Sequence, residues 1–384
     1  HDNLVAAYSW NGRFFHMPAQ EEVRRGSDKT MKDDIKAHLL PELQRIMTEW
    51  DEPEYRAGQI FKWLHSGVRS FDEMTDIPKA LRDRLAERFY ITVPEVVSKQ
   101  VSKDGTIKYL WRLTDGNTVE SVIMSYRHGY TVCISSQVGC RMGCRFCAST
   151  LGGLVRNLSA SEMVDQVLFS QLDSGNRISN IVLMGIGEPL DNYDNVLRFL
   201  QLISDPRGMN IGQRHISVST CGLVEKVDKL GADKLQFTLS VSLHAPDDET
   251  RSHLMPVNRA YGVDRVLKAC HAYFKRTGRR VSYEYAMIDG VNDTPRHARL
   301  LADKLKKTQN QQSHVNLILL NKVTETKLAP STRGNMQAFV KILQDSGINV
   351  TVRRTLGGDI DASCGQLRRK NPGYDTEAGR KDSK

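Results

Sequence analysis

Three cysteines lie close together in the sequence, at Cys140, Cys144 and Cys147. The spacing Cys-x-x-x-Cys-x-x-Cys puts three thiolates on one short loop, and three thiolates can hold three irons of a cubane [4Fe–4S] cluster. The fourth iron would lack a protein ligand and could bind a chelating small molecule. A structural zinc site is the alternative, but it uses four protein ligands, and no fourth Cys or His adjoins this loop. The spacing therefore favours an iron–sulfur centre with one open position.

The remaining cysteines are scattered along the chain. The total of seven is odd and of low density, which excludes a small secreted protein held together by disulfides. Cys221 and Cys270 belong to no motif, and Cys270 lies mid-helix among apolar residues, as expected of a core residue. Cys133 precedes the loop, and Cys364 lies near the C-terminus, beyond a Gly357-Gly358 pair that would let its segment fold back.

The composition is that of a globular protein with a mild basic excess. Among 384 residues, 54 Lys and Arg against 45 Asp and Glu leave a formal charge of +9, and 40% are hydrophobic. A basic excess favours a polyanionic partner such as nucleic acid, although this one is too small to identify it. No run reaches the ~18 apolar residues of a membrane span, and the first residues lack the apolar centre of a secretory signal. We expect a cytoplasmic protein that does not enter a membrane.

The elements that position the cysteine loop form a repeating pattern. From about residue 130, apolar strand-like runs alternate with amphipathic helical stretches. The expected strands are 132–136, 181–185, 215–220, 236–243, 281–288 and 314–320, with a last one near 348–354. The expected helices are 160–172, 192–203, 263–276, 295–307 and 334–345. Six strand–helix units predict a parallel sheet, closed or nearly closed into a barrel, with its chemistry at the carboxyl ends of the strands.

The rest of the chain divides into smaller parts. Helical stretches at 57–65 and 79–89 precede two alternating runs, 108–113 and 118–124, with an Asp115-Gly116 turn between them. The expected parts are an N-terminal extension (1–30), a helical accessory domain (31–94), a β-hairpin extension (95–126), the barrel (127–354) and a C-terminal tail that carries Cys364 (355–384).

Four segments together carry a resemblance to a known family. They are Cys133-Ile-Ser-Ser-Gln-Val-Gly-Cys140-Arg-Met-Gly-Cys144-Arg-Phe-Cys147-Ala-Ser-Thr, Met184-Gly-Ile-Gly-Glu188-Pro, Ser240-Val-Ser-Leu-His244-Ala and Asp359-Ile-Asp-Ala-Ser-Cys364-Gly-Gln-Leu. They resemble the RlmN/Cfr family of radical S-adenosylmethionine (SAM) RNA adenine methyltransferases, over about residues 31–370. The resemblance implies an α/β fold: a partial, TIM-like (β/α)6 barrel with a small helical N-terminal domain and a C-terminal active-site tail.

The resemblance also implies a reaction. It is closest to the RlmN branch, which methylates C2 of an adenine in 23S rRNA and adenine 37 of some tRNAs. That electron-poor carbon is a poor nucleophile, so a radical route is needed, with one [4Fe–4S] cluster and two SAM molecules per turnover. An electron donor such as flavodoxin or ferredoxin and a monomeric enzyme are expected. The alternative is C8 methylation of the same 23S rRNA adenine, as in Cfr-type antibiotic resistance.

Three residues match the positions to which the family's chemistry is assigned. Cys364 matches the cysteine that takes a methyl group from the first SAM and carries it to the RNA, because sulfur is a good nucleophile. Cys133 matches the second cysteine, which attacks Cys364, frees the methylated RNA and leaves a disulfide. Glu120 matches the proton acceptor at the modified carbon.

Further positions match the family's contacts with SAM and with RNA. The SAM contacts are Gly187, Glu188, Ser219, Ser242, Leu243, His244 and Asn321. Taken alone, a Gly-x-Gly-Glu segment is also typical of a tight turn, and a single His on a strand is often a core residue. The sequence departs from the family pattern where Leu319-Leu320-Asn321 lacks a proline and where Ser363 replaces a common Ala. Expected RNA contacts are Arg353, Arg354, Arg368, Arg369 and Lys370 near the tail, and Tyr55-Arg56 and Lys62-Trp63 in the helical domain.

Overall fold

The computed structural model describes residues 8–10, 13–15, 32–233, 235–309, 313–320, 328–354, 356–360 and 366–369. Of the expected extension 1–30, two short antiparallel strands, β1 (Tyr8–Trp10) and β2 (Arg13–Phe15), fall in these ranges. The predicted site residues Asn321 and Cys364 lie outside them.

A ten-stranded sheet forms the centre of the protein, in the order β16-β15-β14-β13-β12-β11-β8-β7-β6-β5. From β8 to β16 neighbouring strands are parallel, and from β8 to β5 they are antiparallel. The parallel strands are β8 (Gly129–Cys133), β11 (Ile178–Leu183), β12 (Ile216–Thr220), β13 (Thr238–Ser242), β14 (Val281–Met287), β15 (His314–Leu319) and β16 (Asn349–Val352). The antiparallel strands are β5 (Glu95–Val101), β6 (Ile107–Arg112) and β7 (Thr118–Tyr126).

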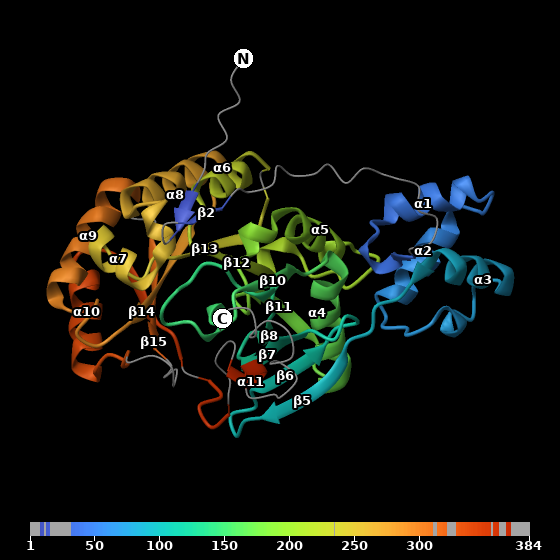
Figure 1. The fold of residues 1–384 in the computed structure, drawn as a ribbon, viewed down its shortest axis with the longest axis horizontal. Helices are drawn as coiled ribbons and strands as arrows, with labels where there is room; N and C mark the ends of the chain where they lie inside the picture. Colours follow the sequence, from blue (N-terminus) through green and yellow to red (C-terminus); the bar gives the residue numbers. More distant parts are fainter. Residues whose placement is uncertain are drawn as a thin grey trace, which may run out of the picture.

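Helices connect the parallel strands and cover the outer face of the curved sheet (Figure 1). They are α4 (Ala160–Ser174), α5 (Tyr193–Ser204), α6 (Val224–Asp233), α7 (Asp248–Leu254), α8 (Val263–Thr277), α9 (Pro295–Gln309) and α10 (Arg333–Asp345). The capping box expected at the start of α4 is present, because the Ser159 hydroxyl accepts from the Glu162 N–H at 3.2 Å and the Glu162 carboxylate accepts from the Ser159 N–H at 2.9 Å. None of the described helices combines the length and the apolar character that a bilayer crossing requires.

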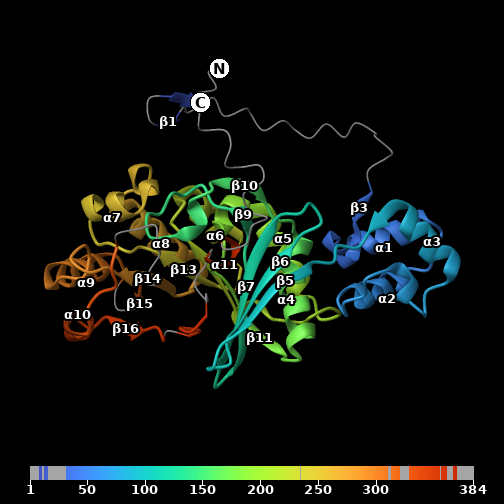
Figure 2. The ribbon, with the colours of Figure 1, turned by 60° about the horizontal axis from the view of Figure 1, so that its bottom comes forward.

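The partial (β/α)6 barrel is confirmed, and the structure adds elements that the sequence did not reveal. The strand β5 turns the expected hairpin into three antiparallel strands, which form a long twisted ribbon at one edge of the sheet (Figure 2). The helices α6 and α7 were not predicted. α6 buries Val224, Val227 and Leu230, and three apolar residues are too few to stand out as a helical period. α7 is mostly polar and starts at an Asp247 cap, so it has no apolar stripe at all.

The N-terminal helices α1 (Leu40–Glu49), α2 (Tyr55–Leu64) and α3 (Lys79–Arg88) lie beside α4 and α5 (Figure 1). Their apolar side chains belong to the same continuous core cluster as those of the barrel. The Arg198 guanidinium of α5 pairs with both Glu42 carboxylate oxygens, at 2.6 and 3.0 Å. A buried ion pair, Lys36–Asp165, joins the segment before α1 to α4. The helical domain is therefore packed firmly onto the barrel.

Candidate active site

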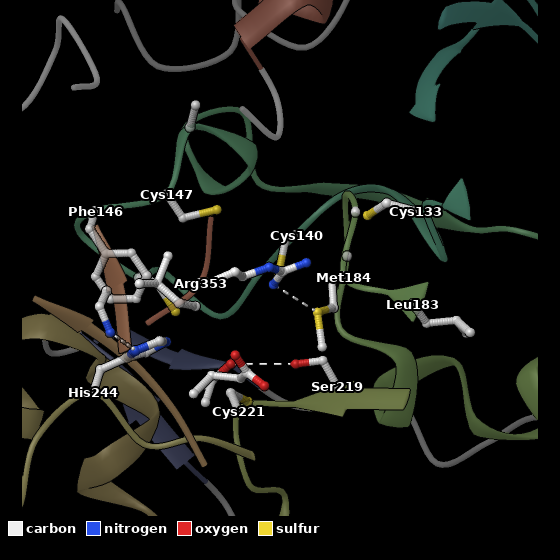
Figure 3. Close-up of a pocket in the computed structure, with 18 of the residues that line it drawn as sticks. Cys133, Cys140, Phe146, Cys147, Leu183, Met184, Ser219, Cys221, His244 and Arg353 are labelled. Atoms are coloured by element: carbon white, nitrogen blue, oxygen red, sulfur yellow. Dashed lines mark hydrogen bonds between the residues drawn. The ribbon is translucent and has the colours of Figure 1, made fainter. Parts of the chain in front are cut away.

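A cavity of about 380 Å³ lies at the carboxyl ends of the parallel strands. Its lining includes most of the residues that the sequence singled out: Cys133, Cys140, Cys144, Cys147, Gly187, Glu188, Ser219, Ser242 and His244. Figure 3 shows several of these side chains converging on the same space from different strands and loops. Leu243 and Glu120 are not among the lining residues. The rest of the described set therefore lies around one cavity at the strand ends.

Backbone hydrogen bonds shape the loop that carries the three cysteines. Cys140 follows the short strand β9 (Gln137–Gly139), and its N–H donates to the Gly153 carbonyl at 2.9 Å. The Cys147 N–H donates to the Cys144 carbonyl at 3.1 Å, which folds the second half of the loop into a turn. Cys140, Cys144 and Cys147 all line the cavity.

Two glycines after β11 let this segment lie close to the backbone around Ile134 and Gln137. A Cβ on Gly185 would lie 2.6 Å from the Ile134 carbonyl oxygen. Gly187 has a φ of 111°, and a Cβ there would lie 2.7 Å from the Gln137 Cβ. Both contacts are closer than any side chain allows, so the Gly-x-Gly spacing is a packing requirement of this cavity wall.

Glu188 is buried at the end of β11 and ties it to the end of β12. One carboxylate oxygen accepts from the Leu190 N–H at 3.0 Å, and the other accepts from the Cys221 N–H at 2.8 Å. Burial raises the pKa of Glu188, while the N–H of Cys221 opposes that rise. The carboxylate thus holds two strand ends together while it also borders the cavity.

The ends of β12 and β13 supply hydroxyl groups and a strained histidine. The Ser219 and Ser242 hydroxyl oxygens lie 3.5 Å apart. His244 has a φ of 56°, a left-handed conformation that is costly for a residue with a Cβ. Its Nδ1 accepts from the Ala286 N–H at 2.9 Å, so the neutral ring carries its hydrogen on Nε2. Burial lowers the pKa of His244 to about 3, with Arg251 acting in the same direction.

Glu120 lies on β7, beneath the described part of the tail. Its carboxylate pairs with the buried Lys108 at 2.8 Å and accepts from the Arg368 N–H at 2.6 Å. Arg368 belongs to α11 (Gln366–Arg369), a single turn of the tail. Val122 and Met124, which follow Glu120 at alternate positions of β7, do line the cavity.

Comparisons with known proteins agree with this architecture. Residues 134–301 match the model of the Radical SAM superfamily, and residues 38–91 match that of the ribosomal RNA large subunit methyltransferase N-terminal domain. A protein of Lachnoclostridium phytofermentans named "Probable dual-specificity RNA methyltransferase RlmN" is 53% identical over 88% of this chain and 95% of its own length. One of the same name from Alkaliphilus oremlandii is 51% identical over 88% of this chain and 98% of its own. The chain belongs to the RlmN family of radical SAM RNA methyltransferases.

A solved structure supports the same assignment. The crystal structure of a radical SAM methyltransferase from Sphaerobacter thermophilus has a TM-score of 0.82 and 42% sequence identity, and the match covers 87% of this chain and 98% of that one. As a member of the RlmN family, the protein uses one [4Fe–4S] cluster and SAM, two molecules of it per turnover.

The donor set at the cavity fits that cluster. Burial raises the pKa of the Cys140 thiol to about 12 and that of Cys144 well above its ordinary value, and the thiol of Cys147 acts in the same direction on both. Such thiols become thiolates when cations such as cluster irons bind them. No group of three His, Cys, Asp or Glu side chains within the described ranges is arranged to hold a metal ion. A cubane binds each thiolate through a separate iron, so its three protein ligands need not share one metal ion.

The structure also places residues in the RlmN-family cavity that the sequence did not single out. Glu284, on β14, is buried; its Oε1 accepts from the Asn316 side-chain amide at 2.9 Å, and its Oε2 makes no hydrogen bond with a described residue. Burial raises the pKa of Glu284. Cys221 lines the same wall, near Cys144. A lone acidic residue inside the apolar run 281–287 was the one available signal for Glu284.

The basic residues expected to contact RNA differ in their surroundings. The Arg353 guanidinium projects into the cavity (Figure 3) and donates to the Met184 sulfur at 3.4 Å. Arg354 is exposed, but Arg368 is only 5% exposed, so it is not the solvent-facing phosphate contact that we expected. The side chain of Arg369 and the whole of Lys370 lie outside the described residues.

Proposed function

We propose that this enzyme methylates C2 of an adenine in 23S rRNA and adenine 37 of some tRNAs. The relatives are named dual-specificity RNA methyltransferases, and the N-terminal domain matches a model named for the large-subunit ribosomal RNA. One contact carries the proposal: the N–H of Arg368, four residues beyond Cys364, donates to Glu120. In the sequence, the proposed methyl carrier therefore lies only four positions from a residue that contacts the proposed proton acceptor.

The chain's own residues divide the chemistry among them. Bound SAM and the cluster supply a radical able to remove a hydrogen atom from a methyl group. In this proposal the Cys364 thiolate first attacks the methyl carbon of one SAM, and S-adenosylhomocysteine leaves. Once the methyl carbon has lost a hydrogen atom, it adds to adenine C2 as a carbon radical. The adduct then gives up one electron, equal to the one that the reductant first supplied, and Glu120 accepts the proton from C2. The Cys133 thiolate then attacks the Cys364 sulfur, the carbon–sulfur bond breaks, and the carbon takes a proton to become the methyl product.

The position of Cys133 supports this division. It ends β8, is 8% exposed, lines the cavity and packs with Val122 and Met124 of β7. It is therefore next to the strand that bears Glu120 and separate from the three cysteines of the loop. A thiol at that junction is well placed to act on an adduct formed near Glu120.

A nucleoside assay tests the carbon and the substrate together. Ribosomal RNA and tRNA from a knockout strain complemented with this chain would be digested and analysed by mass spectrometry. We expect 2-methyladenosine in both RNAs, and none when the strain carries Cys144→Ala. Detection of 8-methyladenosine without 2-methyladenosine would refute the proposal and indicate C8 methylation instead.

A trapping experiment tests the cysteine roles. Cys133→Ala should leave RNA attached to Cys364, which an RNase-sensitive gel shift would detect. Cys364→Ala should abolish both the shift and methylation while the brown colour and iron content stay unchanged. Cys221→Ala is the matched control, because Cys221 also lines the cavity but has no role in the release step. Normal turnover by Cys133→Ala would refute release through a disulfide.

The helical N-terminal domain offers a surface for the RNA partner. Tyr55 is 60% exposed, and the Arg56 guanidinium lies 5.0 Å from its ring centroid, a pair that could stack on an unpaired base. We propose that this pair binds RNA. We also propose that the enzyme is a monomer and that a small electron carrier such as flavodoxin or ferredoxin reduces it. Tyr55→Ala should then raise the KM for RNA severalfold and leave the iron content unchanged.

A further inference from the structure

The tail meets the antiparallel strands on both sides of Cys364. We propose that β5–β7 form a docking platform for the tail, with Ser102, Asp104 and Lys108 as positioning residues. The proposal rests on the proposed function insofar as Cys364 is the methyl carrier. An upstream anchor holds residues 356–360, and a downstream anchor holds 366–369.

The upstream anchor is built around the turn between β5 and β6. One Asp104 carboxylate oxygen accepts from the Thr106 N–H at 2.9 Å, which fixes the side chain within its own turn. The other oxygen accepts from the Gly357 N–H of the tail at 2.8 Å. In the opposite direction, the tail's Asp359 accepts from the Ser102 hydroxyl and from the Lys103 N–H. The β5–β6 turn thus supplies one carboxylate to the tail, and the tail supplies one to the turn. More than 250 positions of sequence separate the paired residues.

An apolar contact connects this anchor to the cavity. Leu356, directly before Gly357, packs against Cys133, Val122 and Met124 and lines the cavity. Gly357 has a φ of 65°, the left-handed conformation that glycine adopts without strain. The tail therefore passes from the cavity wall to the β5–β6 turn through a sharp change of direction.

The downstream anchor is buried. Lys108 is 0% exposed and Glu120 is 3% exposed, and their side chains pair at 2.8 Å. The carboxylate's second oxygen receives the Arg368 N–H at 2.6 Å, while Leu367 and Arg368 are themselves buried. Lys108 compensates the charge of the carboxylate, and the carboxylate in turn accepts a backbone donor of the tail.

The two anchors lie close together in the sequence. Only five positions, 361–365, separate them, and both anchors contact the same three strands or the β5–β6 turn. A group tethered in this way has a high effective concentration at its target. We therefore assign Ser102, Asp104 and Lys108 to presenting the thiol, not to the reaction itself.

Hydrogen exchange on the cluster-loaded, full-length protein tests the platform directly. We expect Asp104→Ala to raise amide exchange in residues 356–360 at least fivefold and to increase the rate at which iodoacetamide alkylates Cys364, as read by peptide mass spectrometry. Asp115→Ala is the matched control: Asp115 caps the neighbouring β6–β7 turn through the Asn117 N–H and contacts Arg156, not the tail. Exchange and alkylation unchanged in Asp104→Ala would overturn the proposal.

Kinetics separate positioning from a general loss of structure. Asp104→Ala should lower kcat for RNA methylation about fivefold with little change in the KM for SAM, and Asp104→Asn, which keeps one acceptor oxygen, should restore part of it. A KM effect alone would contradict a positioning role. If Cys364→Ala still methylates RNA, the proposed function fails, whereas the exchange result for Asp104→Ala would stand. Lys108→Gln should increase amide exchange in residues 366–369. If Lys108→Gln does not fold, the result for Asp104→Ala still decides the proposal.

Discussion

The parallel and antiparallel halves of the sheet place their functional residues in different ways. In the parallel half, Cys140, Glu188 and His244 lie in the connections that follow β8, β11 and β13, and these connections converge on one cavity. In the antiparallel half, Lys108 and Glu120 lie within strands, on a face covered by the tail. One half can therefore bind a cofactor at its rim, while the other can hold a peptide along its surface.

Cys133 belongs to both halves. It is the last residue of β8, whose register pairs it with Val182 of the parallel strand β11 and with Val122 of the antiparallel strand β7. A residue on this boundary strand can reach the cofactor cavity and the tail together. We therefore expect that substitutions can disturb the cofactor cavity and the tail anchors separately, and that β8 is the strand that both share.

The largest effect should come from the cluster loop. Cys144→Ala removes a cluster ligand, so methylation should fall below detection and iron should fall from about four per chain to near zero. Hydrogen exchange of residues 356–369 should not change, because the tail anchors contain no cluster ligand. Iron analysis, the visible spectrum and exchange on the same sample check this. A loosened tail in Cys144→Ala would show that the two halves are coupled.

Next in size is the buried ion pair of the antiparallel half. Lys108→Met leaves the Glu120 carboxylate buried without its cation, so the free energy of unfolding should fall by about 3–5 kcal/mol. The matched control is Lys99→Met on β5, whose pair with Asp173 is 36% exposed on both sides and should be worth less than about 1 kcal/mol. Urea titrations of both variants check the contrast. Equal losses would mean that burial does not distinguish the two pairs.

A glycine substitution should destabilise the parallel half by a smaller amount. Gly187→Ala adds a Cβ 2.7 Å from Gln137 in a left-handed backbone, so we expect a loss of about 3 kcal/mol from strain and overpacking together and weaker SAM binding. Gly153→Ala is the control, because Gly153 also has positive φ but has open space around it. It should cost about 1 kcal/mol, from strain alone. Thermal melts of both variants measure the two losses of stability, and titration calorimetry measures the change in SAM binding.

The smallest effect should be a change in pH dependence. His244 has a pKa lowered to about 3 by burial, whereas an unfolded histidine titrates near 6.5. Below about 6.5 the unfolded state binds a proton that the folded state does not, so stability falls as the pH falls from 6.5 towards 3. His244→Asn, which tolerates the left-handed backbone, should make the fall in Tm between pH 7 and pH 5 shallower. His128→Asn, at an exposed turn of the antiparallel half, should leave that slope unchanged; equal slopes in all three proteins would contradict the role of burial.

Much of the parallel half could be predicted because its signals are local. The cysteine spacing, the alternation of apolar strands with amphipathic helices and the Ser159 cap each involve residues a few positions apart. The strand β5 was missed because its residues are mostly exposed or half-buried, so it lacks a clear alternation. Glu284 was missed because its surroundings come from neighbouring strands, which a single run of sequence does not contain.

By itself, the sequence determined the chemistry that is available: three thiols with cluster spacing, glycines before Glu188, and further cysteines at 133 and 364. It also determined the barrel, since β-then-α periodicity admits few other topologies. Only the tertiary structure decided that Lys108 partners Glu120, that Arg368 lies against them and that Asp104 receives the tail. The register of β6 and β7 brings Lys108 to Glu120. The tail, in contrast, meets the ribbon across some 250 residues of sequence, a distance over which no local pattern reveals a contact.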